Sequence, residues 1–320
     1  MVPSYSPPDL ETGSFTTPAG VSLGYQRIGR GPPIILANGA GGTFVTWRYL
    51  LEFFKDRFQI ISWDYRGLYS SPPPQNRKAV QIPHHVDDLE ALLDHFQISE
   101  AVFAGWSMGV QVNFELYRRR PEAFAGLAIL NGTAGSPFRT LPAGPCIHRL
   151  IPAILTEVGK IANSFSSPIQ LLARQQVTLT VLKRLGVVAP TLDNEVFGEL
   201  LLGITGLDLQ LYLDILRGLG EHDAWDILPA IRCPTAIISS EHDILTPPDT
   251  ARQIADLIPN ATLKILQGCT HYGAVEAPAG YNQGLNDLLE EYCFDRTSRR
   301  MTEAARLFYR GGVSAMIRSV

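Results

Sequence analysis

Several features that would point to a specialised class of protein are missing from this 320-residue sequence. The N-terminus, MVPSYSPPDLETG, has no basic segment and no apolar run, so it does not resemble a secretory signal peptide and a cytoplasmic location is expected. No stretch approaches the roughly 18 uninterrupted apolar residues of a membrane helix. The most apolar stretch, 200–219, is interrupted by Asp208, Asp214 and Arg217. We therefore expect no membrane span.

An excess of basic charge is also missing. The chain has 27 Lys and Arg residues against 31 Asp and Glu residues, which gives a net charge of −4. This balance carries no electrostatic signature of a nucleic-acid partner or of attraction to anionic lipid. A small molecule is therefore the expected partner.

Cysteine is scarce, and the four cysteines are scattered without a CxxC pair: Cys146, Cys233, Cys269 and Cys293. Without an export signal, such thiols are expected to be reduced and buried. Gly-rich cofactor motifs are lacking too, because neither GxGxxG nor Gly-Lys-Ser/Thr opens a helix. We expect no metal and no organic cofactor.

What the sequence does contain is an alternation of short apolar runs with helical patterns. The apolar fraction is 45% and the charged fraction 18%, which suits a large core. Such alternation predicts an α/β fold with a mostly parallel sheet and right-handed crossovers. Strands are expected at 21–28, 33–37, 58–63, 101–104, 127–130, 235–239 and 263–266, and helices at 47–54, 84–96, 110–117, 248–258 and 281–294.

The alternation stops between residues 135 and 220, where strand signals vanish and helices are expected at 147–161, 169–185 and 195–219. We predict a catalytic core of residues 1–134 and 221–320 with a helical cap at 135–220. The cap helices are expected to cover the core rather than bind membranes.

Residues 1–11 are expected to be a flexible lead-in. A basic tail, 296–320, could cover the protein's own surface or a partner subunit, so a homo-oligomer could form through the cap or this tail.

A candidate nucleophile lies at the end of the strand predicted at 101–104. The sequence Gly105-Trp106-Ser107-Met108-Gly109 fits Gly-x-Ser-x-Gly, and a helix is predicted directly after it. A serine on such a sharp turn needs small neighbours, because a Cβ at either glycine would strike the adjacent strand or helix. The turn would also place the Met108 N–H at a helix N-terminus, where negative charge is stabilised.

A serine nucleophile needs a base, and the base needs an orienting carboxylate. Two later strands end in suitable residues, and the carboxyl ends of parallel strands share one edge of the sheet. We predict His271 as the base, in a loop between Gly268 and Gly273, and Asp243 as its partner. Glu241 is the rival carboxylate; His242 is expected to point away, and Asn131 cannot supply a negative charge.

Asn38-Gly39-Ala40-Gly41-Gly42 follows the buried strand at 33–37. Glycines let backbone N–H groups approach a ligand oxygen, so Ala40 is predicted as the second oxyanion donor beside Met108. Gly39 and Trp106 are predicted to line the substrate site. A phosphate-binding loop is the rival interpretation, but its motifs are absent.

Together these residues resemble the α/β-hydrolase fold superfamily, in its carboxylesterase-like branch, over residues 21–294. The resemblance implies an eight-stranded, mostly parallel sheet with an inserted helical lid. Asp64-Tyr65-Arg66-Gly67 is similar to the superfamily's Asp-x-Arg-Gly turn, where the two charged groups brace the loop. Two positions depart from the pattern: Asn38 stands where His is frequent, and Tyr69 replaces a glycine.

The expected activity is hydrolysis of a small to medium apolar ester through an acyl-enzyme. The same apparatus also serves acyl transfer, C–C bond hydrolysis and cofactor-free perhydrolysis, and these alternatives stay open. A ligand-sensing protein on the same fold is a further alternative. Epoxide hydrolysis and dehalogenation are disfavoured, because those relatives need a carboxylate in place of Ser107.

Overall fold

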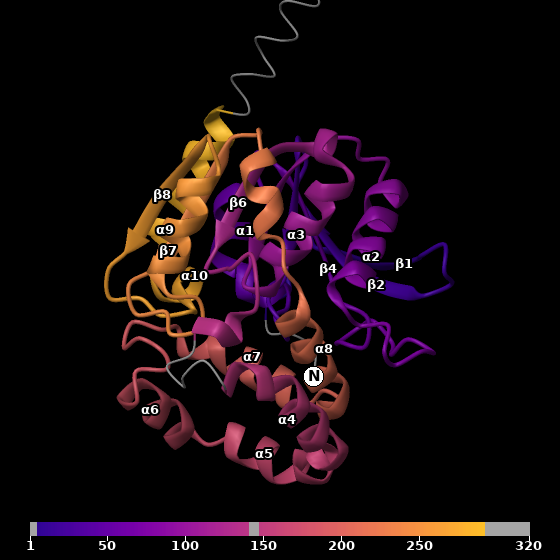
Figure 1. Ribbon diagram of the computed structural model, residues 1–320, viewed down its shortest axis with the longest axis vertical. Coiled ribbons are helices and arrows are strands. Elements are labelled where there is room, and N and C mark those ends of the chain that lie inside the picture. Colours follow the sequence, from indigo (N-terminus) through magenta and orange to yellow (C-terminus); the bar gives the residue numbers. More distant parts are fainter. Residues whose placement is uncertain (1–4, 141–146, 292–320) are drawn as a thin grey trace, which may run out of the picture.

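The computed structural model describes residues 5–140 and 147–291. At its centre lies an eight-stranded sheet with the order β1-β2-β4-β3-β5-β6-β7-β8 (Figure 1). The strands from β3 onward are parallel, and β2 pairs antiparallel with β1 and β4. The predicted mostly parallel eight-stranded sheet is confirmed. The strands are β1 (Glu11–Thr16), β2 (Ser22–Ile28), β3 (Pro33–Ala37), β4 (Gln59–Trp63), β5 (Ala101–Trp106), β6 (Phe124–Leu130), β7 (Thr235–Ser240) and β8 (Ala261–Leu266).

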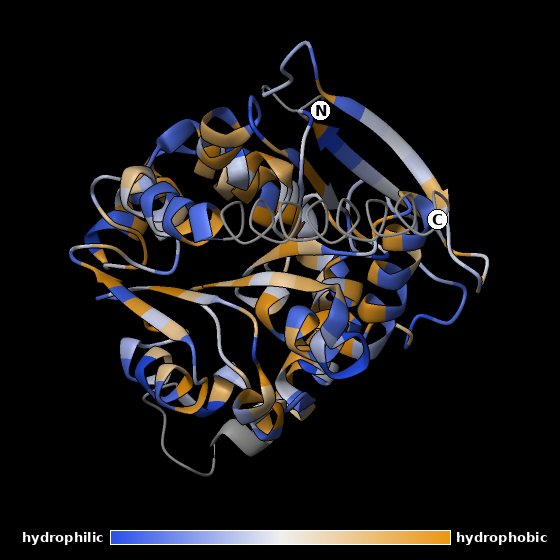
Figure 2. Cartoon of the chain, turned by 90° about the horizontal axis from the view of Figure 1, so that it is seen from above, coloured by the Kyte–Doolittle hydropathy of each residue, from blue (hydrophilic) through white to orange (hydrophobic). Residues whose placement is uncertain are grey.

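Helices cover both faces of the sheet, which explains why its central strands are apolar throughout. Successive side chains point to opposite faces, so Ile35 joins one buried cluster while Ile34 and Leu36 join the other. Figure 2 shows the largely apolar strands between two layers of helices. The first face carries α2 (Ile82–His95), α3 (Met108–Arg119) and α9 (Pro248–Leu257); the second carries α1 (Arg48–Phe54) and a helix at 278–291.

The N-terminal segment differs from the sequence prediction. Residues 1–11 were expected to be a flexible lead-in, but β1 begins at Glu11 and Tyr5 is buried. The Tyr5 hydroxyl donates a hydrogen bond to Glu52 of α1 at 2.7 Å. The strand escaped prediction because only Phe15 among its residues is buried, so an edge strand of this kind shows no apolar alternation.

The described residues between β6 and β7 include five α-helices of the cap, which lie at the lower end of the molecule in Figure 1. They are α4 (Ile147–Ala162), α5 (Ser166–Ala173), α6 (Gln176–Arg184), α7 (Asn194–Thr205) and α8 (Leu209–Glu221). The helices predicted at 169–185 and 195–219 are each two helices, which corrects the sequence interpretation. Asp208 begins α8 by accepting a hydrogen bond from the Leu211 amide. The domain boundaries at 135 and 220 stay predictions.

Within the described ranges, no single helix is both long and apolar enough to cross a bilayer. Helices α7 and α8 are long and apolar enough only when they are taken together, and the chain bends by 103° between them. Cys233 and Cys269 are buried free thiols. Cys146, Cys293 and the predicted tail at 296–320 lie outside the described residues.

Candidate active site

Ser107 occupies a strained turn between β5 and α3. Its backbone angles are φ 54° and ψ −115°, a region that a residue with a side chain rarely adopts. A Cβ at Gly105 would lie 2.6 Å from the backbone of Gly109, and one at Gly109 would lie 2.0 Å from the Ala37 carbonyl oxygen. Only glycine therefore fits on either side of this serine.

Asp243 and His271 are joined by a hydrogen bond, although 28 positions separate them in the sequence. His271 Nδ1 lies 2.8 Å from Asp243 Oδ2, and both side chains are buried. The loops after β7 and β8 carry these residues. The Leu245 and Thr246 amides each donate to Asp243 Oδ1 at 2.9 Å, so the carboxylate is fixed from its own turn.

The electrostatics of Asp243 favour its charged form. Burial raises the pKa of this carboxyl, but the charge of His271 and the hydrogen bonds from His271 and Thr246 outweigh burial and hold the pKa below its usual value. A charged Asp243 at neutral pH can fix the tautomer of His271, with Nδ1 as donor and Nε2 as acceptor.

The rival residues point elsewhere. Glu241 accepts a hydrogen bond from the Gly268 amide at 3.0 Å, and its side chain is partly exposed. The His242 side chain is 62% exposed. Neither residue bonds to His271, so of the two candidate carboxylates the structure brings only Asp243 to the imidazole.

Asn131 takes part in this site, although sequence reasoning dismissed it for lack of charge. Its Nδ2 donates to Asp243 Oδ2 at 2.8 Å and to Ser240 Oγ at 3.0 Å, and its Oδ1 accepts from the Tyr281 hydroxyl. Its φ of 44° lies in the left-handed region, which asparagine tolerates better than most residues. The sequence signal that could have identified Asn131 as a site residue is its position directly after the strand β6.

Trp106 connects the serine turn to the histidine loop. Its Nε1 donates to the His271 carbonyl at 3.1 Å, and the two rings lie 5.7 Å apart. Among the described residues, Ser107 Oγ and His271 Nε2 form no hydrogen bond to each other. Such a bond is often long before substrate binds. The Trp106 ring also packs on Gly39, where a Cβ would lie 2.7 Å from it.

The two predicted oxyanion donors have unused N–H groups. The Met108 amide opens α3, and neither it nor the Ala40 amide donates to another of the described residues. Ser107 and Ala40 are partly exposed, whereas Asp243 and His271 are buried.

The side chain of Asn38, which stands where related sequences often have His, has specific hydrogen-bond partners in this structure. Its Oδ1 accepts from Trp47 Nε1 at 2.7 Å, and its Nδ2 donates to Ser62 Oγ at 3.1 Å and the Trp63 carbonyl at 2.9 Å. Asn38 is fully buried and uses both ends of its amide. It therefore ties the loop that carries Ala40 to the end of β4 and to η1 (Phe44–Trp47).

Tyr69, the second departure, adopts a φ of 50°, which explains why glycine suits this position. Its hydroxyl donates to the Gly41 carbonyl, and its ring lies 3.0 Å from a Cβ placed at Gly203 of α7. The strained residue thus bridges the loop 38–42 and the cap.

The cap also covers the loop 38–42 directly. A Cβ at Gly41 would lie 2.9 Å from both Ile204 and Tyr212, which belong to α7 and α8. Burial raises the pKa of the Tyr212 hydroxyl to about 12, so this group stays neutral. Apolar and aromatic side chains thus form the covering of the site.

Glu276 links the loop that carries His271 to the cap through hydrogen bonds. It lies in α10 (Gly273–Glu276) and is buried. Its carboxylate accepts from the Thr270 amide at 2.6 Å, from Thr270 Oγ1 at 2.7 Å and from the Ala189 amide at 2.8 Å. Thr270 precedes His271, and Ala189 lies just before α7, so one carboxylate fixes both segments.

Asp64 and Arg66, the two charged residues of the turn after β4, stabilise this turn through different hydrogen-bond partners. Asp64 accepts from the Ser70 amide and from Gln26 Nε2, each at 3.2 Å. Arg66 donates from Nε to Asp88 Oδ2 at 2.8 Å, and this pair is buried. Burial raises the pKa of the Asp64 carboxyl, although hydrogen bonds from Ser70 and Gln26 oppose the shift.

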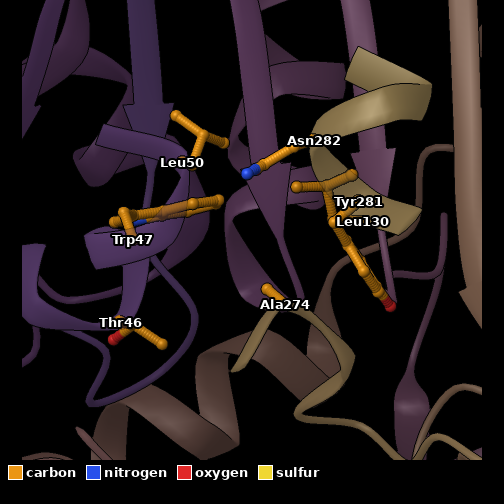
Figure 3. Close-up of a pocket in the computed structure, with 7 residues that line it drawn as sticks. All are labelled: Thr46, Trp47, Leu50, Leu130, Ala274, Tyr281 and Asn282. Atoms are coloured by element: carbon orange, nitrogen blue, oxygen red, sulfur yellow. The ribbon is translucent and has the colours of Figure 1, made fainter. Parts of the chain in front are cut away.

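A small cavity lies beside the site and is drawn in Figure 3. It is lined by Thr46, Trp47, Leu50, Leu130, Ala274, Tyr281 and Asn282. None of the residues predicted to react contributes to its lining. Among residues 5–140 and 147–291, no three His, Cys, Asp or Glu side chains are grouped as metal ligands.

Comparison with known proteins agrees with this architecture. A family profile described as the alpha/beta hydrolase fold matches residues 32–145. The solved structure of a thermophilic esterase from Thermogutta terrifontis is similar, with a TM-score of 0.71, 22% identity and coverage of 88% of this chain and 99% of the esterase. These findings show that the chain has the α/β-hydrolase fold.

Individual relatives within this fold have different reactions. The chain is 24% identical to 3-oxoadipate enol-lactonase 2 of Acinetobacter baylyi, over 85% of this chain and 94% of that protein. A bromoperoxidase from Bacillus anthracis superposes with a TM-score of 0.70 at 16% identity, covering 87% of this chain and all of the other. Taken together, the relatives support a hydrolase.

Proposed function

We propose that this protein is a serine carboxylic-ester hydrolase that acts on small to medium apolar esters. The observation that carries the proposal is the buried hydrogen-bonded pair of Asp243 and His271 in the loops after β7 and β8, and a strained Ser107 directly after the parallel strand β5 supports it. A hydrogen bond from Trp106, the neighbour of Ser107, to the backbone of His271 links the two halves. The similar esterase and enol-lactonase add support, because a lactone is a cyclic ester.

In the proposed mechanism, Ser107 Oγ attacks the acyl carbon while His271 Nε2 takes the hydroxyl proton. Asp243 holds the imidazole and stabilises its cation. The amides of Ala40 and Met108 donate to the oxyanion, and His271 then protonates the leaving alcohol. Water, deprotonated by His271, hydrolyses the acyl-enzyme and restores Ser107. Gly39 and Trp106 border the acyl site in this proposal.

The substrate class follows from the covering of the site. Ile204, Tyr212 and Tyr69 lie above the loop 38–42, and none of them is charged at neutral pH. An apolar acyl or alcohol group would replace water there with a gain of about 25 cal/mol per Å² of apolar surface buried. A charged substrate would lose its hydration without an ion pair to compensate.

The test is a chain-length series of p-nitrophenyl esters with the purified protein. We expect turnover that Ser107→Ala reduces to background, and stoichiometric labelling of Ser107 by a serine-directed phosphonate. Glu241→Gln is the matched control, because this carboxylate lies in the same loop as Asp243 but does not bond to His271; it should retain activity. Unchanged turnover in Ser107→Ala would contradict the proposal. Product analysis with alcohol or peroxide acceptors would distinguish acyl transfer and perhydrolysis.

A further inference from the structure

Large apolar side chains are exposed on one part of the cap. Of the fifteen large hydrophobic residues that are exposed in the described structure, eleven lie between residues 150 and 185. A typical soluble surface scatters such residues singly, and a concentration of this kind marks an interaction site. The eleven are Leu150, Ile154, Val158, Ile161, Phe165, Ile169, Leu171, Leu172, Val177, Val181 and Leu185.

Helix α4 has two apolar faces, and only one of them is covered. Gly159 and Ala162 are buried, and Gly159 approaches Gln210 of α8. The outward face carries a stripe at positions 150, 154, 158 and 161, which continues to Phe165. This spacing of three and four residues places the four side chains of α4 on one side of the helix, along about 16 Å.

Helix α6 repeats the arrangement. Val177, Val181 and Leu185 follow one another at intervals of four residues and are 62%, 44% and 71% exposed. Leu171 and Leu172 at the end of α5 are equally open. Figure 1 shows α4, α5 and α6 together at the end of the molecule farthest from the sheet. The exposed apolar residues thus lie on helices gathered at this end of the molecule, and we call residues 150–185 the cap surface.

The charge of the cap surface is opposite to that of the whole protein. It contains Lys160, Arg174, Lys183 and Arg184 but only one acidic residue, Glu157, so its net charge is +3 in a chain of net charge −4. Arg174 and Arg184 are exposed and have no acidic partner among the described residues. Exposed apolar side chains and unpaired cations thus coincide.

Contrary to the expectation from the sequence that the cap helices only cover the core, we propose that the cap surface docks on an anionic phospholipid membrane, with the stripes of α4 and α6 inserted at the headgroup boundary. A helix that lies in this plane needs an apolar face and nearby basic residues, and both are present. A second copy of the chain fits less well, because a two-fold interface would bring two surfaces of charge +3 together. The proposal goes beyond the ester hydrolysis proposed above and does not depend on it.

The test is sedimentation of the full-length protein with vesicles of phosphatidylcholine alone and with vesicles containing about one third phosphatidylglycerol. We expect at least about tenfold stronger binding to the anionic vesicles, and weaker binding at high salt. Ile154→Asp/Val158→Asp should abolish binding. Arg174→Glu/Arg184→Glu should remove the preference for anionic lipid. Leu257→Asp, on the exposed side of α9, is the matched control and should bind like the parent.

Circular dichroism and turnover of a soluble ester should be unchanged in all these variants, because the substituted side chains are exposed. Equal binding of the parent and Ile154→Asp/Val158→Asp, or no binding to anionic vesicles, would overturn the proposal. A parent that is dimeric in solution, with monomeric Ile154→Asp/Val158→Asp, would overturn it in favour of a second copy. Vesicle binding is measured without substrate, so a failure of the esterase proposal leaves this test intact.

Discussion

Asn131 donates a hydrogen bond to the same carboxylate oxygen of Asp243 that accepts the one from His271. The amide therefore stabilises the negative charge on the oxygen atom that also accepts from the imidazole. Because Tyr281 in turn donates to Asn131 Oδ1, the orientation of the amide is fixed and its Nδ2 faces Asp243. We infer that Asn131 is a positioning residue of the proposed site.

Asn131→Asp should shift the pH dependence of the reaction. The new carboxyl would replace the amide that donates to Asp243 Oδ2, and two carboxyls so close cannot both ionise, so they would share a proton. The acid limb of kcat/KM should therefore move to higher pH. The loss at neutral pH should be about tenfold or more. Tyr281→Phe keeps the amide and should give a smaller effect without moving the limb. An unshifted profile in Asn131→Asp would show that this residue has only a structural role.

His85 should make the folded protein sensitive to acid. It is buried beneath Tyr65, and burial together with the charge of Arg66 lowers its pKa to about 3. Between that value and about pH 6.5 the unfolded chain binds a proton that the folded chain does not, so stability falls as the pH falls, by about 1.4 kcal/mol per unit.

Urea unfolding of the parent and of His85→Gln at about pH 7.5 and about pH 5 measures this contribution. The loss of unfolding free energy between the two pH values should be about 2 kcal/mol smaller in His85→Gln. The exposed His242 provides the control, since His242→Gln should lose as much stability as the parent. Parallel pH curves for the parent and His85→Gln would refute the assignment.

Asn38→Ala should destabilise the fold by about 2–4 kcal/mol. The substitution leaves the buried Trp47 indole N–H and the Trp63 carbonyl without their partner, and an unsatisfied buried polar group costs about 1–3 kcal/mol. Chemical denaturation measures the loss. Asn76→Ala, at an exposed loop position, should stay within about 0.5 kcal/mol of the parent. A similarly small effect at Asn38 would mean that water replaces its hydrogen bonds.

Tyr69→Gly should widen the preferred substrate range. It removes the ring between Gly41 and Gly203 and places glycine at a position with φ of 50°. Longer acyl chains should gain in kcat/KM relative to acetate. Tyr69→Phe keeps the ring and should keep the parent's chain-length profile. If both variants retain that profile, the ring does not border the acyl site.

The sequence predicted the parallel core well, because buried strands such as 33–37 and 101–106 are continuous apolar runs that end in glycine-rich turns. The prediction failed at β1, because its mostly exposed residues show no alternation of apolar and polar side chains. It also missed the end of α7 and the start of α8 near Asp208, because the apolar residues continue across this break. Ser107, Asp243 and His271 could be proposed from the sequence because each follows a predicted strand. Asn131 and Glu276 were not recognised, because their roles come from hydrogen bonds across distant loops.

The shared acceptor at Glu276 limits how freely the lid could be exchanged. A chimaera that replaced the whole insertion with that of a related enzyme would lose the Ala189 donor, and the carboxylate would then hold Thr270 alone. The imidazole of His271, the next residue in the chain, would then be held less firmly, although the exchange had not changed its own loop. Grafts that keep the short connection around Ala189 and exchange only the preceding helices avoid this defect, so the covering of this enzyme is not a fully separable module.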